Sequence, residues 1–196
     1  MVVAIVETGE KEMVTLVSRT GRHLQRYSSI GRRLVVGCIP YRFIEDETSK
    51  NCSDRDIEVL VISSQKGYGH GVLFPKGGWE TDESMVDAAS REALEEAGVR
   101  GDVQERLGKW SFKSKRYGTY YDGFMFPLLV KEQLDLWPEE HVRHRRWVTV
   151  AEARESCQQW WMKEALETLV NRLSNSVGHT IKDLTVIEKK MGHQLH

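Results

Sequence analysis

The chain has 196 residues, of which 40% are hydrophobic and 29% charged, and its formal net charge is -1. This length suits one domain with short extensions, and the composition is typical of a folded soluble protein. Because the net charge is close to zero, bulk electrostatics gives no support for a nucleic-acid or membrane partner. Any function that depends on charge must therefore come from local clusters.

The cysteines and the beginning of the chain bear on the compartment. Cys38, Cys52 and Cys157 are few and odd in number and have no CxxC spacing, which argues against a disulfide framework and against a zinc site. The first residues lack the basic start of a secretory signal, and no apolar run approaches the ~20 residues that cross a bilayer. We expect a cytosolic or nuclear protein, with a mitochondrial location left open.

The first half of the chain is predicted to form strands and then a helix. Residues 33–44 and 57–65 are rich in β-branched side chains and indicate strands, and 71–75 indicates a short third strand. Residues 45–56 are predicted to form a polar loop, and the glycine-rich 66–71 a turn. The helix that follows is expected to begin at an N-cap on Thr81 or Asp82 and to end at Gly98. Its apolar side is expected to comprise Val86, Ala89, Ala93, Leu94 and Ala97.

The second half is predicted to return to strands and to end in helices. Residues 108–118 and 119–131 indicate two strands around a turn near Gly118, and 145–150 a short final strand. Thr149 and Glu152 have the spacing of a capping box, and 158–174 has the periodicity of an amphipathic helix. The fold class is therefore predicted as α/β (α+β), a mixed sheet with packed helices. The predicted division is an extension over 1–17, a domain over 18–174 and a mobile tail over 175–196.

Glu92, Glu95 and Glu96 crowd one side of the predicted helix. Like charges at helical spacing repel one another, so a solvated acidic face is the simple alternative to a functional site. Arg91 lies one turn before Glu95 and is placed to steady its carboxylate. The sequence Pro-Lys-Gly-Gly directly before the helix lets backbone carbonyls approach a ligand. Carboxylate and carbonyl oxygens are the ligands that Mg²⁺ prefers, and a bound cation would turn the repulsion into attraction. The pattern therefore predicts a divalent metal site.

The span from Gly77 to Val99 resembles the Nudix box, Gx5Ex7REUxEExGU, in which U is a bulky aliphatic residue. Gly77, Glu83, Arg91, Glu92, Glu95, Glu96, Gly98 and Val99 fill its positions, and Ala93 departs from it because it is small where a larger aliphatic is usual. The resemblance implies the Nudix fold, in which a mixed sheet lies between helices. It also implies a hydrolase that cleaves phosphoanhydride bonds with Mg²⁺ or Mn²⁺.

The resemblance assigns roles by position. Glu92 and Glu96 would be the principal metal ligands, and Glu95 a further ligand or the general base, with Glu92 the second candidate for the base. The backbone of Lys76 or Gly77 would complete the metal site. Arg91 and Glu83 would orient the catalytic glutamates.

Three basic clusters outside the box, at 19–33, 109–117 and 141–147, suggest a small-molecule substrate with many phosphates, although scattered surface cations are the alternative. Over roughly residues 18–172 the chain resembles the plant-like diphosphoinositol polyphosphate phosphohydrolases, which cleave inositol pyrophosphates. His144 stands where that branch usually has lysine. The predicted phosphate contacts are Arg22, Arg26, Arg32, Arg33, Ser64, Lys66, Lys76, Lys115, Arg116, Arg143, His144 and Arg145.

Other functions remain open at this stage. Tyr117, Tyr120 and Tyr121 lie where Nudix enzymes for dinucleoside polyphosphates such as Ap5A or Ap6A often place a base-stacking tyrosine, although they also suit ordinary strand positions. A catalytically silent binding module with the Nudix fold is disfavoured. Such proteins usually lack glutamates of the box, whereas this chain has all of them. An RNA-cap hydrolase would need an extended basic domain, which the sequence does not show.

Overall fold

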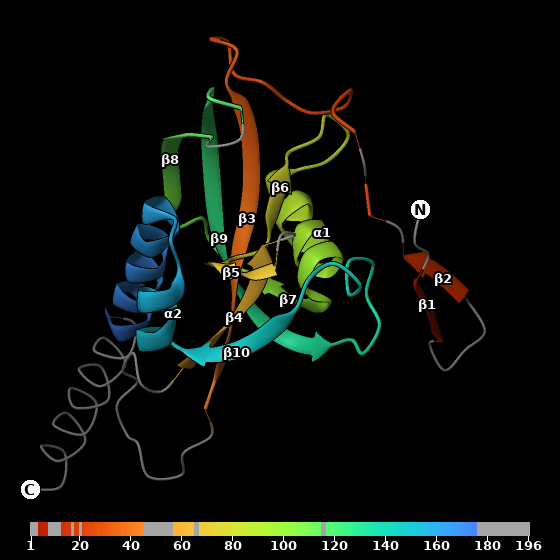
Figure 1. Ribbon diagram of the computed structural model, residues 1–196, viewed down its shortest axis with the longest axis vertical. Helices are drawn as coiled ribbons and strands as arrows, with labels where there is room; N and C mark the ends of the chain where they lie inside the picture. The colour runs from red at the N-terminus through yellow and green to blue at the C-terminus, as the bar shows by residue number, and fades with distance from the viewer. Residues whose placement is uncertain are drawn as a thin grey trace, which may run out of the picture.

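The computed structural model describes residues 4–7, 13–16, 18–19, 21–44, 57–64, 67–114 and 117–175. Within these ranges, a mixed eight-stranded sheet lies at the centre of the fold (Figure 1). A separate antiparallel pair of strands precedes it. The bounds are β1 (Ala4–Glu7), β2 (Met13–Leu16), β3 (Arg33–Phe43), β4 (Ile57–Ser64), β5 (Gly67–Leu73), β6 (Lys76–Gly78), β7 (Val99–Val103), β8 (Gly108–Lys113), β9 (Tyr120–Gln133) and β10 (Arg145–Thr149).

The main path of the sheet runs in the order β10-β4-β3-β9-β7, with β5 beside β4, β6 beside β3 and β8 beside β9. β3 and β9 pair in parallel, from Arg33 opposite Tyr121 to Tyr41 opposite Leu129, and the other pairings of this sheet are antiparallel. The predicted mixed sheet is therefore confirmed. Because β6 pairs with the start of β3, the residues just before the helix are fixed to the middle of the sheet.

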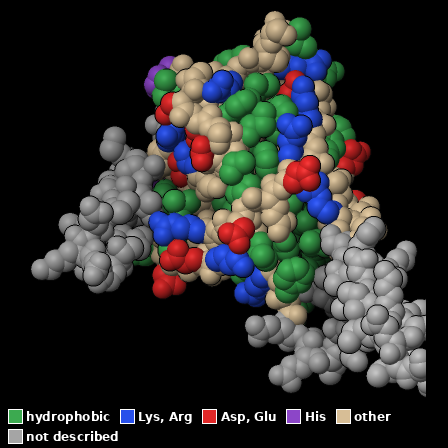
Figure 2. All heavy atoms as spheres, turned by 180° about the vertical axis from the view of Figure 1, so that it is seen from behind, with side chains coloured by type: hydrophobic (Ala, Val, Ile, Leu, Met, Phe, Trp, Pro, Cys, Tyr) green, Lys and Arg blue, Asp and Glu red, His purple; other side chains and the backbone are tan. Residues whose placement is uncertain are grey.

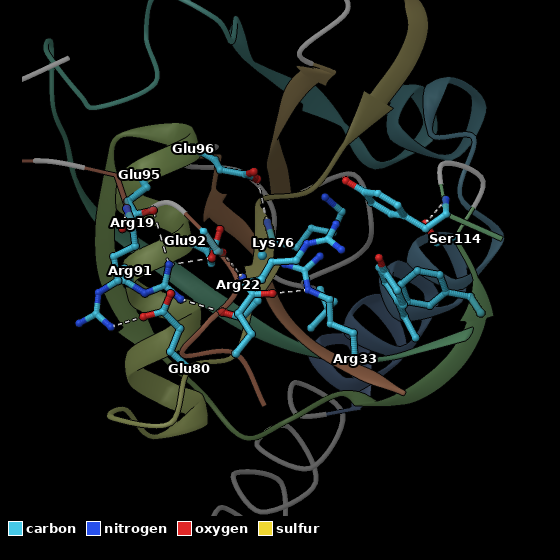
Figure 3. Close-up of a pocket in the computed structure, with 18 of the residues that line it drawn as sticks. Arg19, Arg22, Arg33, Lys76, Glu80, Arg91, Glu92, Glu95, Glu96 and Ser114 are labelled. Carbon is cyan, nitrogen blue, oxygen red and sulfur yellow. Dashed lines mark hydrogen bonds and ion pairs between the residues drawn. The ribbon is translucent and has the colours of Figure 1, made fainter. Parts of the chain in front are cut away.

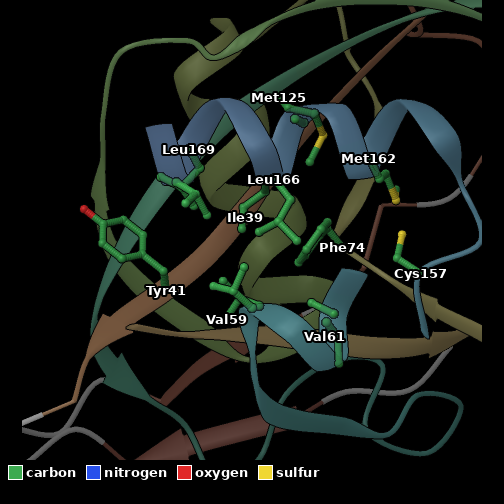
Figure 4. Packing of buried hydrophobic residues seen from close by; sticks show 14 of the residues in the cluster. Ile39, Tyr41, Val59, Val61, Phe74, Met125, Cys157, Met162, Leu166 and Leu169 are labelled. Carbon is green, nitrogen blue, oxygen red and sulfur yellow. The ribbon is translucent and has the colours of Figure 1, made fainter. Parts of the chain in front are cut away.

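Helices cover both faces of the sheet, as Figure 1 shows. On one face lies α1 (Met85–Ala97), whose alanines pack with β3 and β9 side chains such as Val36 and Phe124. On the other lie α2 (Val150–Ser156) and a third helix over residues 160–175. Figure 4 shows the core on this second face, where Ile39, Phe74, Met162 and Leu166 are fully buried. This confirms the expected α+β architecture with helices on both sides.

Several predicted elements are confirmed and a few differ. The strands at β3, β4 and β10 and the Thr149–Glu152 capping box are as predicted. α1 begins later than expected because Ser84, and not Thr81 or Asp82, forms its capping box with Asp87. β5 includes most of the glycine-rich stretch predicted as a turn, and the short β6 and β7 were not predicted. The division into 1–17, 18–174 and 175–196 stays a prediction, and residues 176–196 lie outside the described ranges.

One face of the described surface carries mixed charges. Figure 2 shows the face turned away from the viewer of Figure 1, on which basic and acidic side chains lie next to one another around hydrophobic ones. This mixture agrees with the net charge of -1. Among the described residues, no helix is both long and apolar enough to span a bilayer.

Candidate active site

A cavity of about 560 Å³ opens beside the N-terminal ends of β3 and β6 (Figure 3). Its walls come from α1, β3, β6, β8, β9, the helix over 160–175, residue 19 and residues 21–25. Acidic side chains line one part of it and basic side chains another. The acidic lining residues are Glu80, Glu92, Glu95, Glu96 and Glu139.

The three glutamates of α1 are buried, because at most 6% of each is exposed to solvent. A solvated acidic face, the simple alternative from the sequence, is therefore wrong. Ala88, Ala89, Ala93 and Ala97 form the packed side of the helix, whereas Val86, which was expected there, is 46% exposed. Gly98 ends the helix in the left-handed conformation with φ of 61°, as the sequence predicted.

Arg91 connects the acidic residues around α1. Its guanidinium donates to both carboxylate oxygens of Glu83 at 2.9 and 2.8 Å, and to Glu92 Oε1 at 2.7 Å. It also donates to the Gly78 carbonyl at 3.0 Å and lies 3.5 Å from Glu95 Oε2. One arginine thus fixes the directions of three glutamates relative to the strand β6, which is the geometry expected of an orienting group.

Burial shifts the proton equilibria of these glutamates. It raises the pKa of Glu92 to about 8, with the nearby charge of Glu96 adding to the rise and Arg91 opposing it. It also raises the pKa of Glu95 to about 7 against the opposing effect of Arg91, and it raises the pKa of Glu96 although Lys76 and Arg143 oppose it. Burial would raise the pKa of Glu83 too, but the hydrogen bonds from Arg91 and the Glu80 backbone outweigh it, so that pKa is lowered.

Glu96 is held by residues far from it in the sequence. Its Oε2 accepts from the Lys76 backbone N–H at 2.9 Å, and its Oε1 accepts from the buried Arg143 guanidinium. Arg143 also donates to Glu139 Oε2 at 2.6 Å and to the Ser63 carbonyl at 3.2 Å. A loop between β9 and β10 therefore supplies the countercharge for Glu96.

The donor set fits a divalent cation. Within the described residues, no three acidic, histidine or cysteine side chains already have the spacing of a metal site, and Arg91 and Arg143 pair with Glu92 and Glu96. However, three buried carboxylates whose pKa values are raised lack sufficient positive charge, which is what a hard cation supplies. Gly77 lies so close to this set that an added Cβ would stand 2.0 Å from Glu92 Oε1. Only glycine leaves room there for the carboxylate and a ligand.

The basic part of the cavity contains cations without a carboxylate partner. Among the described residues, Arg22, Arg33, Lys76 and Lys113 line the cavity and form no ion pair. Arg22 lies over the Tyr117 ring at 4.1 Å, and Arg33 donates to Gln25 Oε1 at 2.5 Å. These side chains can therefore bind an anion such as a phosphate group.

Other predicted phosphate contacts have partners elsewhere. Arg26 donates to the carbonyls of Glu80 and Thr81, and Arg32 to Ser111 and the buried Asp122. Arg145 donates to the carbonyls of Ala97, Gly98 and Leu134, and so caps the end of α1. These three arginines, together with Arg143, Ser64 and His144, are not among the cavity-lining residues. Lys66, Lys115 and Arg116 lie outside the described residues.

The sequence reasoning did not select several residues that line the cavity. Glu139, Glu80 and Arg19 belong to its acidic part, and Lys113 to its basic part. No periodicity or motif marks Glu139, and Arg19 lies in the basic cluster 19–33 but was not selected. Lys113 lay in a noted basic cluster, but only the strand pairing of β8 with β9 shows that it reaches the cavity.

Comparison with known proteins identifies the family and agrees with the fold. The NUDIX domain family matches residues 43–169. The chain is 61% identical to Nudix hydrolase 17, mitochondrial, of Arabidopsis thaliana over 178 residues, covering 91% of this chain and 95% of that protein. It is 36% identical to diphosphoinositol polyphosphate phosphohydrolase 2 of Rattus norvegicus over 52% of this chain and 55% of that protein. The fold is similar to that of a C. elegans Ap4A hydrolase, with a TM-score of 0.58, 18% identity and coverage of 73% of this chain and 98% of that structure. The chain therefore belongs to the Nudix hydrolase family.

Proposed function

We propose that this chain hydrolyses phosphoanhydride bonds in highly phosphorylated small molecules with Mg²⁺ or Mn²⁺, and that its substrate is the diphosphate group of an inositol pyrophosphate. The observation that carries the proposal is the division of one cavity into two parts. Buried glutamates line one part, and Arg22, Arg33, Lys76 and Lys113 line the other with no carboxylate partner among the residues that the structure describes. A diphosphate bridged to a cation matches both parts at once.

Glu92 and Glu96 would hold the cation, with the backbone of Lys76 or Gly77 as a further ligand. When bound, the cation would polarise the diphosphate and increase the acidity of a water molecule. Arg91 and Glu83 keep the carboxylates in place through the bidentate pair between them. We assign Glu95 as the group that takes the proton from water, because burial brings its pKa to about 7, near the pH at which a general base works best.

The substrate class rests on the number of free cations and on one relative. Four cations in a single cavity exceed what one diphosphate needs, which favours a substrate with further phosphates. The rat relative is named as a diphosphoinositol polyphosphate phosphohydrolase. Together these observations favour an inositol pyrophosphate.

A dinucleoside polyphosphate such as Ap5A or Ap6A is the second candidate. Phe112, Tyr117 and Tyr121 line the cavity, whereas Tyr120 does not. Phe112 already stacks on Trp161 at 4.5 Å, so an aromatic wall stands beside the phosphate-binding cations. Such a wall suits a nucleobase, because bases stack on aromatic side chains.

A competition panel distinguishes these substrates. Purified protein with Mg²⁺ would receive an inositol pyrophosphate, Ap5A, Ap6A, ADP-ribose and capped RNA at equal concentrations. We expect the inositol pyrophosphate to be consumed first. Faster loss of Ap5A or Ap6A would establish the second candidate, and preference for ADP-ribose or capped RNA would refute the polyphosphate proposal.

A silent binding module is tested with Glu96→Gln. We expect the substitution to lower kcat by roughly 100-fold or more, because it removes a proposed metal ligand. An unchanged rate with Mg²⁺ would mean that the buried glutamates serve binding or stability instead.

The compartment is a separate question. The expected cytosolic or nuclear location stays a prediction, whereas the name of the Arabidopsis relative places that protein in mitochondria, which favours a mitochondrial location here. Imaging the full-length chain with a C-terminal fluorescent protein against organelle markers decides between them.

A further inference from the structure

Residues 18 and 19 lie across the acidic part of the cavity, although they precede the segment that matches the NUDIX family, which begins at residue 43. The backbone N–H of Arg19 donates to Glu95 Oε1 at 3.2 Å, and the Ser18 hydroxyl donates to Glu139 Oε1 at 3.4 Å. Figure 3 shows Arg19 beside Glu95, on the side of the cavity opposite Arg33. A segment far from α1 in the sequence therefore contacts one of its three glutamates.

The Arg19 side chain fastens this segment to the loop before α1. Its Nη1 lies 2.5 Å from Glu80 Oε2 and 2.9 Å from Asp82 Oδ1. Glu80 is buried, and the Arg19 side chain is 40% exposed. Because two carboxylates already bind this guanidinium, it differs from Arg22 and Arg33, which have no carboxylate partner among the described residues. Arg19 is thus built as an anchor and not as a phosphate ligand.

Glu95 depends on this anchor more than its neighbours do. Glu92 accepts from Arg91 at 2.7 Å, and Glu96 accepts from both Arg143 and the Lys76 backbone. In contrast, the contact of Glu95 Oε2 with Arg91 is 3.5 Å long, at the limit of a hydrogen bond. The Arg19 N–H is therefore the shorter of the two contacts that orient the Glu95 carboxylate.

We propose that Arg19 is a positioning residue for hydrolysis: its ion pairs with Glu80 and Asp82 hold its backbone N–H against Glu95 and so fix the direction of that carboxylate. The proposal rests on the role in catalysis proposed for Glu95. It extends the catalytic centre to a residue outside the matched family segment. The Arg19 side chain affects Glu95 only by holding the Arg19 backbone N–H in place, and it does not touch the substrate.

Steady-state kinetics of Arg19→Ala, Arg19→Lys and a matched control test this role. The control is Arg100→Ala, because Arg100 pairs with Glu132 at 3.2 Å, is similarly exposed at 41%, and does not line the cavity. The substrate is whichever member of the panel the wild type cleaves fastest. For Arg19→Ala we expect kcat to fall roughly 10- to 100-fold with KM changed by less than about threefold. Arg19→Lys should recover much of the loss, and Arg100→Ala should match the wild type.

Two kinetic results would overturn the proposal. A raised KM with unchanged kcat for Arg19→Ala would mean that Arg19 contacts the substrate. Wild-type values of both constants would mean that Arg19 has no role in hydrolysis. A double-mutant cycle with Glu80→Gln adds a further check: because both changes release the same anchor, we expect the double variant to be no slower than Arg19→Ala. Additive losses would contradict the anchoring.

A structural measurement separates this proposal from the proposed function. In crystals of the metal-free Arg19→Ala variant we expect the 3.2 Å contact between the residue 19 N–H and Glu95 to be lost, with α1 and the sheet unchanged. If the segment remains on Glu95, the anchoring is refuted whatever the rates are. If the wild type cleaves no member of the panel, the proposed function fails, and the crystal comparison still decides the role of Arg19.

Discussion

Replacing Glu92 by glutamine should stabilise the metal-free protein at neutral pH while impairing its activity. Glutamine keeps the size of the side chain and can still accept a hydrogen bond from Arg91, but it carries no charge. In the folded wild type, burial and the charge of Glu96 raise the pKa of Glu92 to about 8, against an ordinary value of 4.5. The folded state therefore resists ionisation of this side chain, and the unfolded chain does not.

The sign and size follow from proton linkage. Between pH 4.5 and about 8 the folded protein binds the Glu92 proton more tightly than the unfolded chain, so the contribution of this group to stability falls as pH rises. The folded pKa lies about 3.5 above the ordinary value, and a change of one in pKa corresponds to about 1.4 kcal/mol. Wild type should thus lose on the order of 4 kcal/mol relative to Glu92→Gln between pH 4 and pH 8. At about 2–4 °C per kcal/mol this is on the order of 10 °C in Tm.

Urea unfolding in EDTA at pH 5, 6, 7 and 8 measures the effect as the difference between variant and wild type. Using the difference cancels the titration of groups that do not interact with Glu92. Glu132→Gln is the matched control for the exchange of a carboxylate for an amide, because Glu132 is an exposed glutamate that also pairs with an arginine. A difference for Glu92→Gln that is flat or that falls with pH would refute the reasoning. Adding Mg²⁺ at pH 8 should then stabilise wild type more than the variant.

Three further predictions concern other parts of the site. Gly77→Ala should lower kcat roughly 10- to 100-fold, because the Cβ of the alanine would stand 2.0 Å from Glu92 Oε1 and displace that carboxylate. Circular dichroism should show an unchanged fold, and an unaltered kcat would contradict the close approach of Gly77 to Glu92. Arg145→Ala should reduce the free energy of unfolding by about 1–3 kcal/mol, since the carbonyls of Ala97 and Gly98 at the end of α1 and of Leu134 just after β9 lose the Arg145 donor. Its KM should stay constant; a higher KM would instead support the phosphate contact that the sequence predicted. Arg33→Ala should raise KM for the preferred polyphosphate by about 10-fold. Arg32→Ala should leave KM unchanged, because the Arg32 side chain pairs with Asp122. Equal effects of the two substitutions on KM would count against the cavity as the phosphate site.

Helix α1 shows how far the sequence alone reaches. The interval between the glutamates, the glycine at each end and the alanine face are all local features, and they predict both the helix and its donor set. The burial of Glu92, Glu95 and Glu96 is not a local feature. Glu96 pairs with Arg143, which is 47 residues away, and Glu95 accepts from the backbone N–H of Arg19, which is 76 residues away. Helical periodicity carries no information about such partners.

The basic clusters show a second feature that the sequence alone does not predict, namely which arginines face the cavity. Arg32 and Arg33 are adjacent in the sequence, yet Arg33 lines the cavity and Arg32 pairs with Asp122. Successive residues in extended chain point to opposite faces, so a cluster of arginines at one end of a strand is divided between two environments. Which arginine reaches the cavity depends on the register of β3 with β9 and β6. The sequence identified the clusters but not the division within them.

The balance of charge around the cavity explains why a cation and a polyphosphate suit it together. Arg19, Arg91 and Arg143 are the cations that pair with the acidic residues, which are Glu80, Glu83, Glu92, Glu95, Glu96 and Glu139. Acids therefore outnumber their cations there, and raised pKa values of Glu92 and Glu95 mean that protons make up part of the deficit near neutral pH. A divalent cation can replace those protons. Among the described residues it leaves Arg22, Arg33, Lys76 and Lys113 without an ion pair, and the polyphosphate that we propose as substrate carries the negative charges that would neutralise them. Each half of the cavity is thus incomplete without one of the two ligands, and a metal-bound diphosphate brings both charges to the point where the halves meet.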